Sequence, residues 1–121
     1  MSIVLYLEDT SDQQHLVAMV LRSIGLEVDL ASDGQEGLKK ISQRRPDLIL
    51  LDLGMPRVDG FDFMTVVKAR EETQDIPIVV ISAWTANMHR EKAAEAGAIA
   101  FISKPYELDD LITTIQQHLP A

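Results

Sequence analysis

The chain has 121 residues, of which 46% are hydrophobic, so it is long enough for one domain with its own core and too short for two. It contains no cysteine, which excludes disulfides and thiolate metal sites, and no apolar run approaches the roughly 18 residues of a membrane span. A net charge of −8 argues against direct binding of nucleic acid or of an anionic membrane by this domain. Because Met1 leads into an apolar run without a basic segment or cleavage site, we expect a cytoplasmic location.

Five short segments along the chain have the patterns of β-strands. A shorter segment, Glu27–Ala31, alternates apolar and polar residues and indicates an edge strand. The other four are continuous apolar runs, which are typical of parallel strands buried on both faces. They are Ile3–Leu7, Leu48–Leu51, Ile78–Ile81 and Ile99–Ile102.

Amphipathic segments follow each of these strands. The sequence Ser11-Asp12-Gln13-Gln14 has the S-x-x-Q pattern of a capping box and predicts the start of the first helix, which Gly25 would end. The apolar face of that helix is expected to carry Leu16, Val17, Val20, Leu21 and Ile24. Further helices are predicted around Leu38 and Ile41, around Phe61, Met64 and Val67, over about Thr85–Ala96 with Gly97 as its stop, and over Tyr106–Leu119.

Five alternations of strand and helix with short connections predict a single α/β domain over residues 1–121. Such a domain has a parallel sheet with helices on both faces. In these sheets, ligands bind at the carboxyl ends of the strands, so the residues that follow each apolar run decide the function.

Polar side chains stand at four of these strand ends. Glu8 and Asp9 follow the first strand, Asp52 the third, Ser82 the fourth and Lys104 the fifth. Three carboxylates at one edge of a sheet repel each other and favour a bound cation. Oxygen ligands without His or Cys suit a hard ion such as Mg²⁺. A structural alternative is that Glu8 and Asp9 cap the first helix and that Asp52 pairs with Lys104.

These motifs together resemble the receiver domain of two-component response regulators over essentially the whole chain. They are Glu8-Asp9, the stretch "DLGMPRVDG" from Asp52, Ser82-Ala83 and Lys104-Pro105. The resemblance implies the strand order 2-1-3-4-5 with five helices on both faces, as in chemotaxis receivers.

The resemblance also implies the chemistry of the site. Asp52 would be the phosphoacceptor that attacks a phosphohistidine of a partner histidine kinase or histidine phosphotransfer protein. Lys104 would bind a phosphoryl oxygen as a point charge, and Ser82 would bind another. Mg²⁺, or Mn²⁺ in its place, would be held by Asp52 and by the remaining ligands, which are Glu8, Asp9 and the backbone carbonyl of Gly54.

Three further positions match regulatory positions of the family. Phe101 matches the switch aromatic that turns inward as Ser82 moves toward the phosphoryl group, which would change the surface of the fourth helix, fifth strand and fifth helix for a downstream protein. Gly54 and Trp84 stand where receivers tune the lifetime of the phosphoryl group. The Lys104-Pro105 bond is commonly cis in this family.

The last helical segment bears on the oligomeric state. The segment Tyr106–Leu119 contains no Lys or Arg, which argues against the dimers of one winged-helix branch that use basic residues there. A monomer or a phosphorylation-dependent dimer is expected. The chain is either a natural single-domain receiver or the receiver of a larger regulator.

Three other classes fit the pattern less well. A haloacid-dehalogenase-type phosphatase would need a second Asp where Gly54 stands. In a flavodoxin-like FMN carrier, Glu8 and Asp9 would repel the flavin phosphate. A pseudo-receiver that serves only as an interaction module would lack one of Asp9, Asp52 and Lys104, and all three are present.

Overall fold

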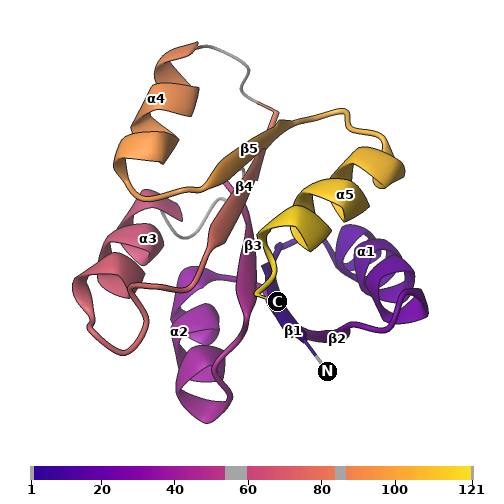
Figure 1. The fold of residues 1–121 in the computed structure, drawn as a ribbon, viewed down its shortest axis with the longest axis horizontal. Coiled ribbons are helices and arrows are strands. Elements are labelled where there is room, and N and C mark those ends of the chain that lie inside the picture. The colour runs from indigo at the N-terminus through magenta and orange to yellow at the C-terminus, as the bar shows by residue number, and fades with distance from the viewer. Residues whose placement is uncertain (1, 54–59, 84–86, 121) are drawn as a thin grey trace.

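The computed structural model describes residues 2–53, 60–83 and 87–120, and within them five strands alternate with five helices (Figure 1). The strands are β1 Ile3–Leu7, β2 Glu27–Ala31, β3 Leu48–Asp52, β4 Ile78–Ser82 and β5 Ala100–Ser103. The helices are α1 Ser11–Ser23, α2 Gly34–Gln43, α3 Gly60–Ala69, α4 Asn87–Glu95 and α5 Leu108–His118. All strand pairs are parallel and their order is β2-β1-β3-β4-β5, which confirms the expected fold class and strand order.

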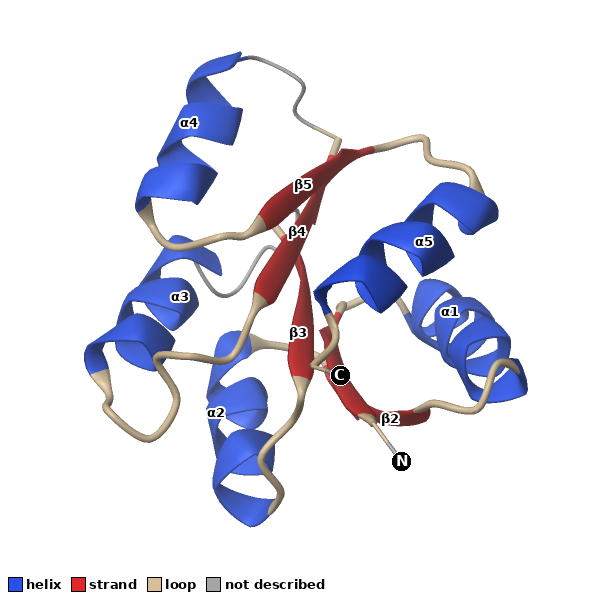
Figure 2. Cartoon of the chain, in the orientation of Figure 1, coloured by secondary structure: helices blue, strands red, loops and turns tan. Residues whose placement is uncertain are grey.

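Helices cover both faces of the sheet and close two separate cores (Figure 2). The helices α2, α3 and α4 pack on one face, and α1 and α5 pack on the other. Strand β3 lies at the centre of the sheet, and all five of its residues are buried. None of the helices that the structure describes is long and apolar enough to cross a membrane.

The strand predictions are correct to within one residue. β1 and β2 have the expected bounds, whereas β3 and β4 each extend by one residue, to Asp52 and Ser82. β5 begins and ends one residue later than expected, at Ala100 and Ser103, because Ala100 is the first residue that pairs with β4. The polar residues at the ends of β3 and β4 therefore belong to the hydrogen-bonded sheet itself.

The predicted capping box at the start of α1 is wrong. Thr10 is the N-cap residue and Ser11 is the first helical residue, and the cap has no side-chain hydrogen bond. Gln14 donates from Nε2 to the backbone carbonyl of Glu8 and to Ser32 Oγ, 3.3 Å away, so it joins α1 to the ends of two strands. At the other end, Gly25 has a φ of 91°, which confirms it as the stop of the helix.

Two helices bury less of their apolar face than the sequence pattern predicts. In α1 the buried residues are Val17, Ala18 and Leu21, whereas Leu16 and Ile24 are exposed. In α5 the buried residues are Leu111 and Ile115, and Leu108 is exposed at the first position of the helix. The exposed apolar residues Leu16 and Leu108 lie on neighbouring elements near the carboxyl edge of the sheet, where both line one pocket.

We expect Gly37→Ala to destabilise the fold, although alanine is the better helix former. A Cβ at position 37 would lie 2.7 Å from Leu7 Cδ2 and 3.1 Å from Phe63 Cε1, and Leu7 is fully buried. The net loss should be about 1–2 kcal/mol in chemical denaturation. The exposed substitution Gln35→Ala in the same helix should change stability by less than about 0.5 kcal/mol. Equal stability of Gly37→Ala and the wild type would mean that α2 moves away from β1 at no cost.

Candidate phosphorylation site

The four polar strand ends meet at one edge of the sheet. In the register, Asp52 pairs with Ile81, the residue before Ser82, and Ser82 pairs with Ser103, the residue before Lys104. The backbone N–H of Lys104 donates to the carbonyl of Ser82 at 2.8 Å, so the ladder continues beyond β5. The sheet itself thus fixes these residues relative to one another.

A partly buried ion pair forms the centre of this edge. Asp52 is 3% exposed, and its Oδ2 accepts a hydrogen bond from Lys104 Nζ at 2.5 Å. The same Nζ lies 4.0 Å from Oε2 of Glu8, which is 2% exposed. Burial alone would lower the pKa of Lys104, but the hydrogen bond and the charge of Asp52 raise it above its ordinary value. Lys104 is therefore a permanent cation beside two buried carboxyl groups.

Glu8 has one satisfied and one unsatisfied carboxyl oxygen. Oε1 accepts from the backbone N–H of Thr10 at 3.2 Å, whereas Oε2 is buried without a hydrogen-bond partner among the residues that the structure describes. Burial, and after it the neighbouring carboxyl group of Asp52, raise the pKa of Glu8 to about 7 from its ordinary value of 4.5. At neutral pH, ionisation of Glu8 beside the Asp52 carboxylate is energetically unfavourable, and a bound cation would offset that unfavourable energy.

The remaining predicted metal ligands are Asp9 and the backbone carbonyl of Gly54. Asp9 follows Glu8 and its side chain is exposed. Gly54, like Trp84, lies outside the described residues. Within the ranges 2–53, 60–83 and 87–120, no three His, Cys, Asp or Glu side chains form a group that could hold a metal ion.

The donor set nevertheless fits a hard cation at Glu8 and Asp52. Two buried carboxyl groups face a single ammonium, and one buried oxygen of Glu8 has no donor among the described residues. Oxygen-only ligands of this kind suit Mg²⁺. The structural alternative is also realised in part, because Asp52 pairs with Lys104 and Glu8 accepts from the N-cap residue of α1.

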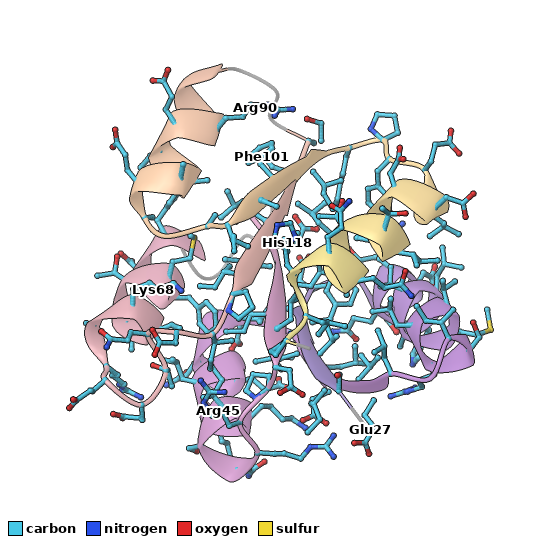
Figure 3. The ribbon with its side chains drawn as sticks, viewed as in Figure 1. Glu27, Arg45, Lys68, Arg90, Phe101 and His118 are labelled. Carbon is cyan, nitrogen blue, oxygen red and sulfur yellow. The ribbon has the colours of Figure 1, made fainter. Side chains whose placement is uncertain are left out.

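The two predicted switch residues lie in the neighbouring strands β4 and β5. Ser82 is 1% exposed at the end of β4, and Phe101 in β5 is half-buried against the core formed with α2, α3 and α4. The ring of Phe101 lies 4.9 Å from Arg90 Cζ of α4 (Figure 3). The Lys104-Pro105 peptide bond after β5 is cis, as expected.

Two tyrosines were not singled out as site residues from the sequence. Tyr6 is buried in β1 and donates a hydrogen bond to the hydroxyl of Tyr106, which follows Pro105. Burial and the nearby charge of Glu8 raise the pKa of Tyr6 far above its ordinary value. The sequence signal is the single hydroxyl within an otherwise apolar strand, since a buried tyrosine hydroxyl usually has a partner.

The comparisons with known proteins agree with this geometry. The family model of the response regulator receiver domain matches residues 4–116. The transcriptional regulatory protein PrrA of Mycobacterium tuberculosis is 36% identical over 113 residues, which make up 93% of this chain and 48% of PrrA. The chain thus spans about half the length of the PrrA proteins that it matches.

Two solved structures are similar over nearly their whole length. Chemotaxis protein CheY4 of Vibrio cholerae has a TM-score of 0.93 and 30% identity, covering 98% of this chain and 99% of CheY4. The receiver domain of the sensor histidine kinase PA1611 of Pseudomonas aeruginosa has a TM-score of 0.87 and 28% identity, covering 97% and 96%. That receiver domain holds a magnesium ion coordinated in its active site cleft.

The doubly wound sheet and the acidic site at its carboxyl edge define an α/β signalling domain. The chain belongs to the response regulator receiver domain family. Membership of this family connects the chain with the phosphorylation-based signalling of two-component systems.

The raised pKa of Glu8 gives stability a specific pH dependence. Between pH 4.5 and about 7 the folded state binds the proton that the unfolded state has released, so stability falls as the pH rises through this window. Glu8→Gln removes this titration and keeps an oxygen for the N–H of Thr10. It should stabilise the protein by on the order of 2 kcal/mol at pH 8 and much less at pH 5 in urea denaturation. The same gain at both pH values would contradict this assignment.

Proposed function

We propose that residues 1–121 act as one receiver domain in which Asp52 accepts a phosphoryl group from a phosphohistidine. The donor would be a partner histidine kinase or histidine phosphotransfer protein. The observation that carries the proposal is the buried Asp52 carboxylate, held by Lys104 at 2.5 Å beside the unsatisfied Oε2 of Glu8. A carboxylate in this position is a fixed nucleophile with a cation beside it.

The transfer is an in-line displacement at phosphorus. One oxygen of Asp52 forms a bond to phosphorus while the P–N bond of the phosphohistidine breaks, and the imidazole keeps the electron pair. Lys104 would then donate hydrogen bonds both to a phosphoryl oxygen and to Asp52, since its ammonium has three N–H donors. Ser82 lies one residue beyond the β4 partner of Asp52, so its hydroxyl is the donor proposed for a second phosphoryl oxygen.

The proposed metal ligands are Asp52 and its acidic neighbours. Glu8 and Asp9 follow β1, and the carbonyl of Gly54 completes the set carried over from the family. Bound Mg²⁺ would neutralise charge on the transferring phosphoryl group. The magnesium in the PA1611 receiver domain supports this choice, and Mn²⁺ takes the same oxygen ligands.

A pocket beside the ion pair is a suitable docking surface for the phosphodonor. It has a volume of about 510 Å³ and lies between the start of α1 and the loop after β5. Its walls include Lys104 and Glu8 of the site and the exposed apolar residues Leu16 and Leu108. An apolar surface directly beside the nucleophile is what a docked helical partner needs to bring its phosphohistidine within reach.

The output is proposed to use the surface formed by α4, β5 and α5. A second pocket of about 400 Å³ opens there, lined by Phe101, Tyr106, Asp110 and neighbouring residues. Movement of Ser82 toward the phosphoryl group and of Phe101 inward would change this pocket and its affinity for a downstream protein. The strong net negative charge supports a protein partner rather than direct DNA or membrane binding by this domain, whether in a cytoplasmic monomer or in a phosphorylation-dependent dimer.

Asp52→Asn should abolish phosphorylation. Incubation of the wild type with Mg²⁺ and acetyl phosphate should add one phosphoryl mass, and the variant should gain none, because the amide is not a nucleophile. Asp62→Asn, an exposed acid in the first turn of α3, is the matched control and should be labelled like the wild type. Unchanged labelling of Asp52→Asn would disprove the assignment.

Removal of the divalent cation should stop the same reaction. With excess EDTA the wild type should remain unlabelled by acetyl phosphate, and added Mg²⁺ or Mn²⁺ should restore labelling. Asp9→Asn should raise the Mg²⁺ concentration for half-maximal labelling by at least about tenfold, since it removes one charged ligand. Rates in EDTA equal to those in Mg²⁺ would exclude a metal-dependent transfer.

A further inference from the structure

Arg90 of α4 makes two contacts with β5, the edge strand. Its guanidinium carbon lies 4.9 Å from the centre of the Phe101 ring, within the range of a cation–π contact. Its Nη2 donates to Ser103 Oγ at 2.9 Å. In Figure 3 the side chain extends from α4 toward β5, above Phe101. One exposed side chain thus joins the helix to two residues of the strand.

The two contacts depend on the shape of the guanidinium group. Phe101 and Ser103 are two residues apart in β5, so both side chains project to the same face of the sheet. A planar guanidinium can lie on a ring and donate from its edge at the same time, whereas an ammonium cannot do both well. Although Glu107 and Asp110 line the same pocket, Arg90 forms no ion pair with an acid among the described residues.

Both contact residues are directly connected to the phosphorylation site. Ser103 pairs with Ser82 across the sheet and precedes Lys104 in the chain. Phe101 is the residue whose inward movement the proposed function requires. If the ring turns inward, it leaves the guanidinium, and any shift at the end of β5 strains the bond to Ser103.

We propose that Arg90 is a positioning residue of the switch, which holds Phe101 and the end of β5 in the resting arrangement and is released when Asp52 is phosphorylated. This inference rests on the proposed function. Loss of the Arg90 contacts should raise the population of the phosphorylation-competent arrangement and therefore the rate at which a small phosphodonor modifies Asp52.

The test compares initial rates of phosphorylation of the full chain by acetyl phosphate with Mg²⁺, followed by intact-protein mass. Arg90→Gln should raise the rate roughly two- to fivefold. This is the change in population that results from loss of one exposed cation–π contact. Ser103→Ala removes only the hydrogen bond and should raise the rate less. Arg90→Lys keeps the charge but cannot contact Phe101 and Ser103 equally well at the same time. Its rate should therefore lie between those of the wild type and Arg90→Gln.

Lys92→Gln is the matched control for charge. Lys92 also belongs to α4 and also lies over a ring, that of Phe61 at 4.4 Å, but among the described residues it forms no hydrogen bond or ring contact with β5. Removal of a positive charge should by itself weaken attraction of the anionic donor, so Lys92→Gln should leave the rate unchanged or slightly lower it. An increase with Arg90→Gln and none with Lys92→Gln therefore supports the proposal.

A second measurement separates this proposal from the proposed function. Beryllofluoride titrations followed by NMR should show tighter binding to Arg90→Gln than to the wild type, with Phe101 resonances shifted in the free variant. If the wild type is modified at Asp52 but Arg90→Gln matches it in rate and beryllofluoride affinity, the positioning role is wrong. If even the wild type is modified no more than Asp52→Asn, the proposed function fails and the positioning role fails with it.

Discussion

The structure depends on one electrostatic constraint, the sharing of a single ammonium by two buried carboxyl groups. Asp52 ends the central strand β3, Glu8 follows the neighbouring strand β1, and Lys104 follows the edge strand β5. Loss of the Lys104 ammonium would be destabilising, because it would leave the charge of the buried Asp52 carboxylate uncompensated. The parallel sheet order keeps these three groups at one edge, and the hydrogen bond from the N–H of Lys104 to Ser82 fixes the end of the last strand. The sheet is thus a rigid frame around an incompletely neutralised centre, which is the physical condition for cation and phosphoryl binding.

Most of the fold could be predicted because buried parallel strands have a strong local signal. The run at β3 is apolar on both faces, so its existence and its central position follow from hydrophobicity alone. The start of α1 could not be predicted in the same way. The S-x-x-Q pattern indicates a local cap, but Gln14 instead donates to the Glu8 carbonyl and to Ser32, which lie at the ends of two different strands. These tertiary hydrogen bonds of Gln14 replace the local capping hydrogen bond, and a local sequence pattern does not indicate which distant residues Gln14 contacts.

The residues of the site likewise differ in how well they could be predicted from the sequence. Glu8, Asp52, Ser82 and Lys104 could be placed together from the sequence, because each follows an apolar run and parallel strands end at a common edge. The pairing of Tyr6 with Tyr106 and of Arg90 with Phe101 and Ser103 could not. These contacts depend on side-chain directions across elements far apart in the sequence. The Arg90 contacts join α4 to β5, and the tyrosine pair joins β1 to the segment before α5. Such contacts between elements are harder to predict from the sequence than the residues at the strand ends.

The direction of α5 has a practical consequence for labelling or immobilising this domain. Since α5 returns antiparallel to the strands, it ends at the edge of the sheet where the strands begin (Figure 1). The carbonyl of Ser2 accepts from the N–H of Glu27 at 2.9 Å, so the start of the described chain is held at that same edge. A dye, a biotin or a sensor surface attached at either end would therefore sit on the side opposite Asp52. Immobilised or fluorescent forms of the domain would leave the edge that carries Asp52 accessible from solution.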